Sequence, residues 1–374
     1  MAQQHHETTT GTGTAGEALT AYLQEQATEF LRSLRLHRDS ATDAQGAEES
    51  LAAACSMRRA ARRIGGTLHT FRPLLDADWA ASLRPELAWL SGTLAQEHAY
   101  ESRLSRLLEA LHRLSGPPPV PAAVPAPAVA AAGRRSARRS GRPLLERGRG
   151  LGEAWAKAEA PVAAGENGAP RGLAVGAAKA AALLERQLTL ARTRAHSAAL
   201  QALGSSRFHA VADSVAVLAS DVPFNGATDG LERLAATAES ALAEAVAALP
   251  LGQAGHPYNA GALVHGLAAD TAPDAQDAPW LKVRSLLRLH RYAQEVLLGH
   301  ASPEPRIADA SHALNVHREA SAAAAAAAQA ARTPRIAPAT AYALGVLHAD
   351  QRHDVEAARF AFQQAWLHEE ARTW

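Results

Sequence analysis

The chain has 374 residues, of which 47% are hydrophobic, 5% are aromatic and one is a cysteine, and its formal net charge is +1. This charge excludes a globally basic nucleic-acid binder, and a single cysteine excludes an internal disulfide. Alanine is abundant, which favours helix over strand because alanine loses least on entering a helix. We therefore expect an all-α protein with a sizeable buried core.

The first fifteen residues, MAQQHHETTTGTGTA, are polar and rich in Gly and Thr, and we predict a disordered tail over 1–15. This stretch lacks the apolar core of a secretion signal, and no window approaches the roughly 20 apolar residues of a membrane span. No Cys/His spacing typical of a structural zinc site occurs. We therefore expect a cytoplasmic protein without membrane contact, metal or other cofactor.

Proline and arginine divide the helical part of the chain. Helical patterning over 16–115 ends at SGPPPVPAAVPAPAV, because proline lacks an amide donor and fixes φ. We predict a flexible Pro/Arg-rich linker over 116–171, and the seven arginines of its run GRRSARRSGRPLLERGRG face one glutamate there. This run is expected to attract polyanions non-specifically. Helical patterns resume over 172–374, with pauses near SDVPFNGATDG and APDAQDAPW.

Residues 57–71, MRRAARRIGGTLHTF, predict a helix with an apolar and a basic face. Arg58, Arg62 and His69 lie on one side at spacings of four and seven, with Arg59 beside them. This stretch contains no acidic residue, and arginines four apart on a helix repel each other. The basic face therefore suits an external polyanion. The predicted apolar face consists of Met57, Ala60, Ala61, Ile64, Leu68 and Phe71.

A second stretch, LKVRSLLRLHRYAQEVL over 281–297, repeats this design. Arg284, Arg288 and Arg291 share one side at spacings of four and three, and Lys282 precedes them. The predicted apolar face consists of Val283, Leu286, Leu287, Ala293 and Leu297.

The two arginine patterns superpose with one offset, which aligns Arg58 with Arg284. Each stretch is followed by a second predicted helix, which contains LAQEHAYE after the first and LNVHREAS after the second. We interpret this as an internal duplication. It predicts two antiparallel helical bundles, 16–115 and 172–374, related by a pseudo-twofold axis and joined by the linker.

Several stretches together resemble the CHAD domain, an α-helical domain named for its histidines. They are MRRAARRIGGTLHTFRPLLDADWAASLRPELAWLSGTL, WLKVRSLLRLHRYAQEVL and ALNVHREA. The resemblance covers about 20–113 and 183–370. It implies paired helical bundles with a basic surface that binds inorganic polyphosphate, and it implies association with polyphosphate granules.

The resemblance assigns polyphosphate binding to residues on the arginine helices and on the helix after the second of them. Cys55 and Leu281 stand where the signature histidines of the family are expected, and Gly65 stands at a usually basic position. The second stretch matches better, so we expect it to contribute more of the binding. The predicted binding residues are Arg58, Arg59, Arg62, His69, Lys282, Arg284, Arg288, Arg291, His317 and Arg318.

Motifs for chemistry beyond binding are absent from the sequence. It has no Glu-x-Glu-x-Lys triplet of the related triphosphatases, no GxxxxGK[ST] phosphate loop, no HExxH and no GxSxG. Cys55 as a nucleophile competes with the commoner role of a small packing residue. We predict a non-catalytic binder of inorganic polyphosphate or a similar polyanion, without sequence-specific nucleic-acid binding. The alternative is a helical scaffold whose arginines bind an acidic protein partner.

Overall fold

The predicted all-α class is confirmed. In the computed structural model the described chain forms eleven α-helices and one 3-10 helix, and these parts contain no strand. None of the described helices is both long and apolar enough to cross a membrane. The predicted tail up to residue 14 and the predicted linker up to residue 170 lie outside the described residues. The structure describes 15–40, 46–115, 171–226, 230–256, 259–267, 273–299 and 304–367.

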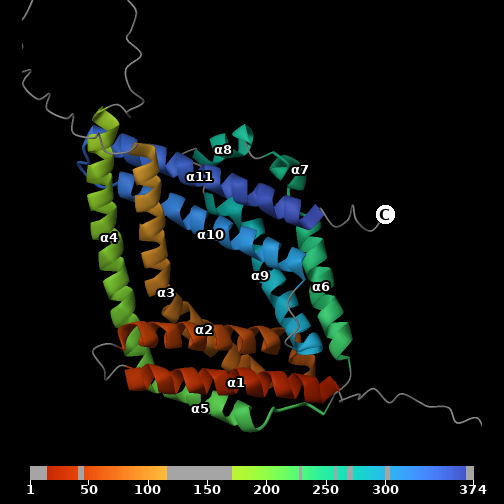
Figure 1. Cartoon of the computed structure of the whole chain (residues 1–374). Helices are drawn as coiled ribbons and strands as arrows, with labels where there is room; N and C mark the ends of the chain where they lie inside the picture. The colour runs from red at the N-terminus through yellow and green to blue at the C-terminus, as the bar shows by residue number, and fades with distance from the viewer. Residues whose placement is uncertain are drawn as a thin grey trace, which may run out of the picture.

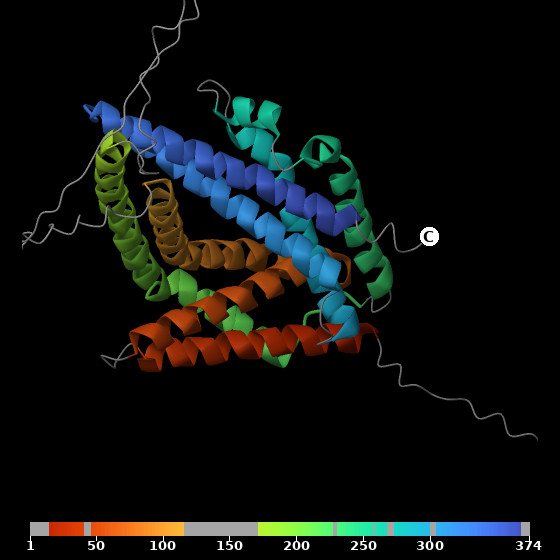
Figure 2. The same cartoon turned by 45° about the horizontal axis from the view of Figure 1, so that its top comes forward.

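The helices form a four-sided frame (Figures 1 and 2). Before the linker lie α1 (Ala15–Ser40), α2 (Ala47–Thr70), η1 (Arg72–Leu74) and α3 (Ala77–Ser115). After it come α4 (Arg171–Leu203), α5 (Ser206–Ser220), α6 (Leu231–Ala247), α7 (Leu251–Ala254), α8 (Ala260–Leu267), α9 (Pro273–Leu298), α10 (Pro305–Ala331) and α11 (Pro338–Leu367). The four sides are α1 with α2 and α5, α3 with α4, α10 with α11, and α6 with α9.

Three hydrophobic cores hold the frame together. The first joins α1, α2 and the start of α3 with α5, α6 and the end of α9. The second joins the end of α3 with α4, α10 and α11, and the third joins α6, α7 and α9 with the other ends of α10 and α11. The first two cores draw on helices before and after the linker. The two predicted halves therefore share cores instead of each burying its own, and their exact boundaries stay a prediction.

The apolar faces read from the two arginine stretches are buried. On α2, the whole predicted face from Met57 to Phe71 is at most 1% exposed. On α9, Val283, Leu287 and Ala293 are buried, while Leu286 and Leu297 are partly buried against the cores. Burial of one face fixes the rotation of each helix, so the arginines point away from the cores.

The second arginine helix begins earlier than the sequence indicated. The pause predicted near APDAQDAPW lies before most of this segment, because α8 ends at Leu267 and α9 already starts at Pro273 and contains Pro279. The predicted pause at SDVPFNGATDG is confirmed, because residues 221–226 and 230 lie between α5 and α6. The alanine-rich tract over 321–331 packs closely against α11.

α2 and α9 come into direct contact at Gly66. A methyl group on Gly66 would lie 2.5 Å from Cδ2 of Tyr292, so only glycine allows this approach. α2 is followed by α3, and α9 is followed by α10. All four helices surround one cavity, an arrangement that the predicted duplication would produce, although the duplication itself stays a prediction.

Candidate anion-binding site

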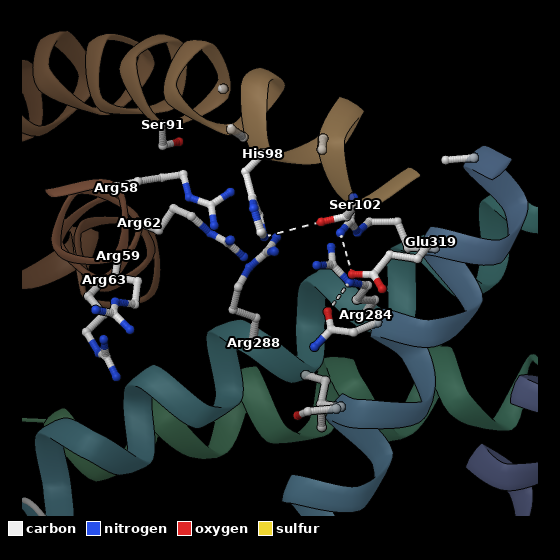
Figure 3. Close-up of a pocket in the computed structure, with 18 of the residues that line it drawn as sticks. Arg58, Arg59, Arg62, Arg63, Ser91, His98, Ser102, Arg284, Arg288 and Glu319 are labelled. Carbon is white, nitrogen blue, oxygen red and sulfur yellow. Dashed lines mark hydrogen bonds and ion pairs between the residues drawn. The ribbon is translucent and has the colours of Figure 1, made fainter. Parts of the chain in front are cut away.

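A cavity of about 610 Å³ lies between α2, α3, α9 and α10. Arg58 and Arg62 reach toward it from α2, and Arg288 faces them from α9 (Figure 3). His98 borders it from α3, and Glu319 of α10 is the only carboxylate among the described lining residues. The arginines that line the cavity are Arg58, Arg59, Arg62, Arg63, Arg103, Arg106, Arg284, Arg288, Arg291 and Arg318.

Most of the predicted binding residues meet at this cavity, although they come from segments more than 200 positions apart. The three arginines predicted on α2 and the three on α9 face each other across it, and Arg318 joins them from α10. Burial of the opposite helix faces produces this convergence. Cys55 lies one turn before Arg58, is partly buried and is not among the lining residues.

Three predicted binding residues do not line the cavity, and a part for them in binding stays a prediction. His69, at the end of α2, lies 2.9 Å from the guanidinium of Arg84. Lys282 is exposed outside the cavity, because two residues before Arg284 is roughly the opposite side of a helix. His317 is 1% exposed and stacks on Trp280 within the third core.

Three arginines that line the cavity were not predicted from the sequence. Arg63 is adjacent to Arg62, and Arg103 and Arg106 lie on the second half of α3. For Arg103 and Arg106 the sequence did offer a signal, because they are three residues apart on a helix face that also carries His98 and Ser102. That signal becomes useful only when α3 is placed beside α2 and α10.

Six of the lining arginines have no carboxylate partner among the described residues. The other four are ion-paired: Arg63 and Arg291 with Glu295, Arg106 with Asp354, and Arg318 with Glu319. The Nε atoms of Arg58, Arg103 and Arg318 are buried without a hydrogen-bond acceptor in the described structure. The unpaired arginines are Arg58, Arg59, Arg62, Arg103, Arg284 and Arg288.

Burial and crowding of like charges disfavour the charged form of these guanidiniums. Burial lowers the pKa of Arg284 to about 9, and Arg288 and Arg318 add to the effect. Burial, followed by the positive charge of Arg62, lowers the pKa of Arg58 and that of Arg288. Arg284 still keeps its proton at neutral pH. The cavity thus concentrates positive charge and unfilled donors, and an anion with several oxygens would relieve both.

Comparison with known proteins identifies the family of the chain. The model of the CHAD domain family matches residues 25–314. The chain belongs to the CHAD domain family. It is also similar to the solved structure of PptA from Streptomyces chartreusis, with 55% sequence identity, a TM-score of 0.71 and coverage of 95% of this chain and 99% of that chain. Comparison with the curated proteins gives no match.

A buried polar network in this CHAD protein connects α9, α10 and α11. Asp277 accepts hydrogen bonds from Arg352 at 2.8 Å and from Arg359 at 2.6 Å, and Ser321 also donates to it. Burial alone would raise the pKa of Asp277, but the hydrogen bonds from Arg352 and Ser321 outweigh burial and lower it. Arg359 also pairs with Glu356 at 2.7 Å. The network therefore ties the start of α9 to the helices packed against it.

We expect the stability of this CHAD protein to fall as the pH decreases from about 6.5 to about 4.5, partly through His317. Burial lowers the pKa of His317 to about 3, outweighing the attraction of Asp277. In the unfolded chain histidine takes up its proton near pH 6.5. Because the unfolded state then binds more protons, His317 reduces the free energy of unfolding by up to about 1.4 kcal/mol per pH unit. Urea unfolding at the two pH values measures this loss.

The variant His317→Gln isolates this contribution from those of other titrating groups. We expect the free energy of unfolding of the variant to depend less on pH over this range, whatever its absolute stability. The same pH dependence in the parent and the variant would contradict the prediction.

Proposed function

We propose that this CHAD protein binds inorganic polyphosphate in the arginine-lined cavity and does no chemistry on it. The main support is a set of six arginines around one cavity that have no carboxylate partner in the described part of the chain. A polyphosphate chain presents charged oxygens at regular intervals, and guanidinium groups hold such oxygens with paired hydrogen bonds. Arginines fixed by the burial of their helices lose little freedom on binding, which reduces the entropic cost.

The proposal includes a cytoplasmic location, where association with polyphosphate granules would follow from binding. It includes neither a sequence-specific nucleic-acid partner nor a membrane partner. The second candidate function is a helical scaffold that binds an acidic protein segment. The same unpaired arginines support it, because they accept carboxylates as well as phosphates.

Binding measured at graded salt concentrations tests the proposal. We expect the parent to bind long-chain polyphosphate, and the logarithm of the affinity to fall linearly with the logarithm of salt with a slope near four, given six arginines and about 0.7 per contact. A chain that lacks 131–150 controls for the basic run of the linker and should lose affinity mainly at low salt. Tripolyphosphate, RNA and polyglutamate serve as competitors.

The competitors separate the two candidate functions. Polyphosphate binding predicts that polyglutamate of equal charge competes poorly. The scaffold function would replace polyphosphate binding if the parent did not bind polyphosphate at moderate salt, or if it bound polyglutamate as tightly as polyphosphate.

A further inference from the structure

A carboxylate just outside the arginine cavity competes for two of its arginines. Arg63 and Arg291 line the arginine cavity and also a second cavity of about 1130 Å³ beside α1. Glu295 lies with these two guanidiniums, at 2.8 Å from Nε of Arg63 and 3.4 Å from Nε of Arg291. It lines the second cavity and is not among the residues that line the first.

Glu295 is held more firmly than a surface carboxylate. The hydroxyl of Tyr22 donates a hydrogen bond to it at 2.7 Å, and its side chain is 21% exposed. Burial alone would raise the pKa of Glu295, but the hydrogen bonds from Arg63 and Tyr22 outweigh burial and lower it, so the carboxylate stays ionised. The guanidinium carbons of Arg63 and Arg291 both lie within 5.9 Å of the ring centroid of Tyr292.

A bound anion could recruit Arg63 and Arg291 only by taking them from Glu295. Glu295 would then keep the Tyr22 hydroxyl alone while remaining mostly buried, and a buried carboxylate without a positive partner is strongly disfavoured. The pair of Arg318 and Glu319 differs, because these side chains are 38% and 46% exposed. Water screens such a pair, so Arg318 stays available to a ligand.

We propose that Glu295 is a specificity-determining residue, which withholds Arg63 and Arg291 from the ligand and limits how much of a polyphosphate chain the cavity binds. The inference rests on the proposed function. The arginines available to the ligand are then the unpaired six, with Arg318 beside them. These arginines are enough to neutralise a short polyphosphate. A long chain would also contact Arg63 and Arg291 if Glu295 did not hold them.

The variant Glu295→Gln removes the competing charge and keeps a side chain of similar shape. We expect it to bind polyphosphate of about one hundred units about tenfold more tightly than the parent at 0.15 M salt. Its salt slope should be steeper by about 1.4, because two more arginines contact phosphate. The affinity for tripolyphosphate should change less than twofold.

Glu29→Gln is the matched control, because Glu29 also lines the second cavity but pairs with Arg32, which does not line the arginine cavity, and the charge change is the same. This variant should bind long-chain polyphosphate and tripolyphosphate with the same affinities as the parent. The inference would be overturned if Glu295→Gln raised the affinity for both ligands equally, or if it did not raise the affinity for the long chain. A parent that binds neither ligand would instead overturn the proposed function, and the inference with it.

A second pair of variants keeps the inference testable should Glu295→Gln fold poorly. Arg291→Gln leaves Glu295 paired with Arg63, so we expect less than a twofold change in affinity for the long chain. Arg288→Gln, one turn earlier on the same helix, should reduce that affinity at least tenfold. Equal losses in these two variants would show that Arg291 serves the ligand and is not withheld.

Discussion

Replacing Arg284 and Arg288 together by glutamine is expected to reduce affinity for long-chain polyphosphate at least a hundredfold at 0.15 M salt. Both guanidiniums are partly buried and face Arg62 across the cavity, and neither has a carboxylate partner among the residues that the structure describes. Each forms charge-assisted hydrogen bonds that are strong in a poorly solvated site. The salt slope should fall by about 1.4, because two phosphate contacts are lost. Titration with polyphosphate at several salt concentrations measures both quantities.

The matching change on the other side of the cavity, Arg58 and Arg62 to glutamine, should weaken binding about as much. The sequence indicated a larger contribution from α9, but in the structure both helices present unpaired arginines to the same cavity. The control is Arg186 and Arg194 to glutamine, a change of equal charge at exposed positions of α4 outside the cavity. A comparable loss of affinity in this control would show that net charge, not the cavity, governs binding.

Neither cavity variant should melt at a lower temperature than the parent. The pKa values of Arg58, Arg284 and Arg288 are lowered, so their charged forms are less favoured in the fold than in the unfolded chain. Removing such charges relieves repulsion. A binding loss with an unchanged or raised melting temperature therefore separates loss of the site from loss of the fold.

Replacing Asp277 by asparagine is expected to lower the free energy of unfolding by about 3–5 kcal/mol. The side chains of Asp277, Arg352 and Arg359 are 2%, 1% and 4% exposed. The change therefore leaves Arg352 buried without its carboxylate and leaves Arg359 with Glu356 alone. Removing one partner of a buried ion pair costs more than the pair contributes, because the remaining charge has no water to solvate it. Urea unfolding at pH 7 measures the loss.

Asp309→Asn provides the control for this stability change. Asp309 is exposed on α10, and we expect its replacement to change the free energy of unfolding by less than about 0.5 kcal/mol. If Asp277→Asn changed the free energy of unfolding as little as Asp309→Asn, the network would contribute little to the packing of α9 against α10 and α11.

Local patterns in the sequence determined the helices and the buried side of the two arginine helices. The spacing of apolar residues from Met57 to Phe71 follows the period of a helix, and burial of that face leaves Arg58 and Arg62 only one direction in which to point. The same reasoning predicted that Arg284, Arg288 and Arg291 share one side of α9, and all three line the cavity. These features depend on neighbours within a few turns, which a linear sequence displays.

The tertiary structure alone decided which charges are neutralised. Glu295 lies four residues after Arg291, but its partner Arg63 is 232 positions away, and Asp277 meets Arg352 and Arg359 from a segment that seemed to be a break. It also placed His317 inside the core, although its sequence neighbour Arg318 reaches the cavity. A carboxylate cancels a guanidinium only within a few ångströms and only where water is excluded, and these two conditions are set by how the helices pack.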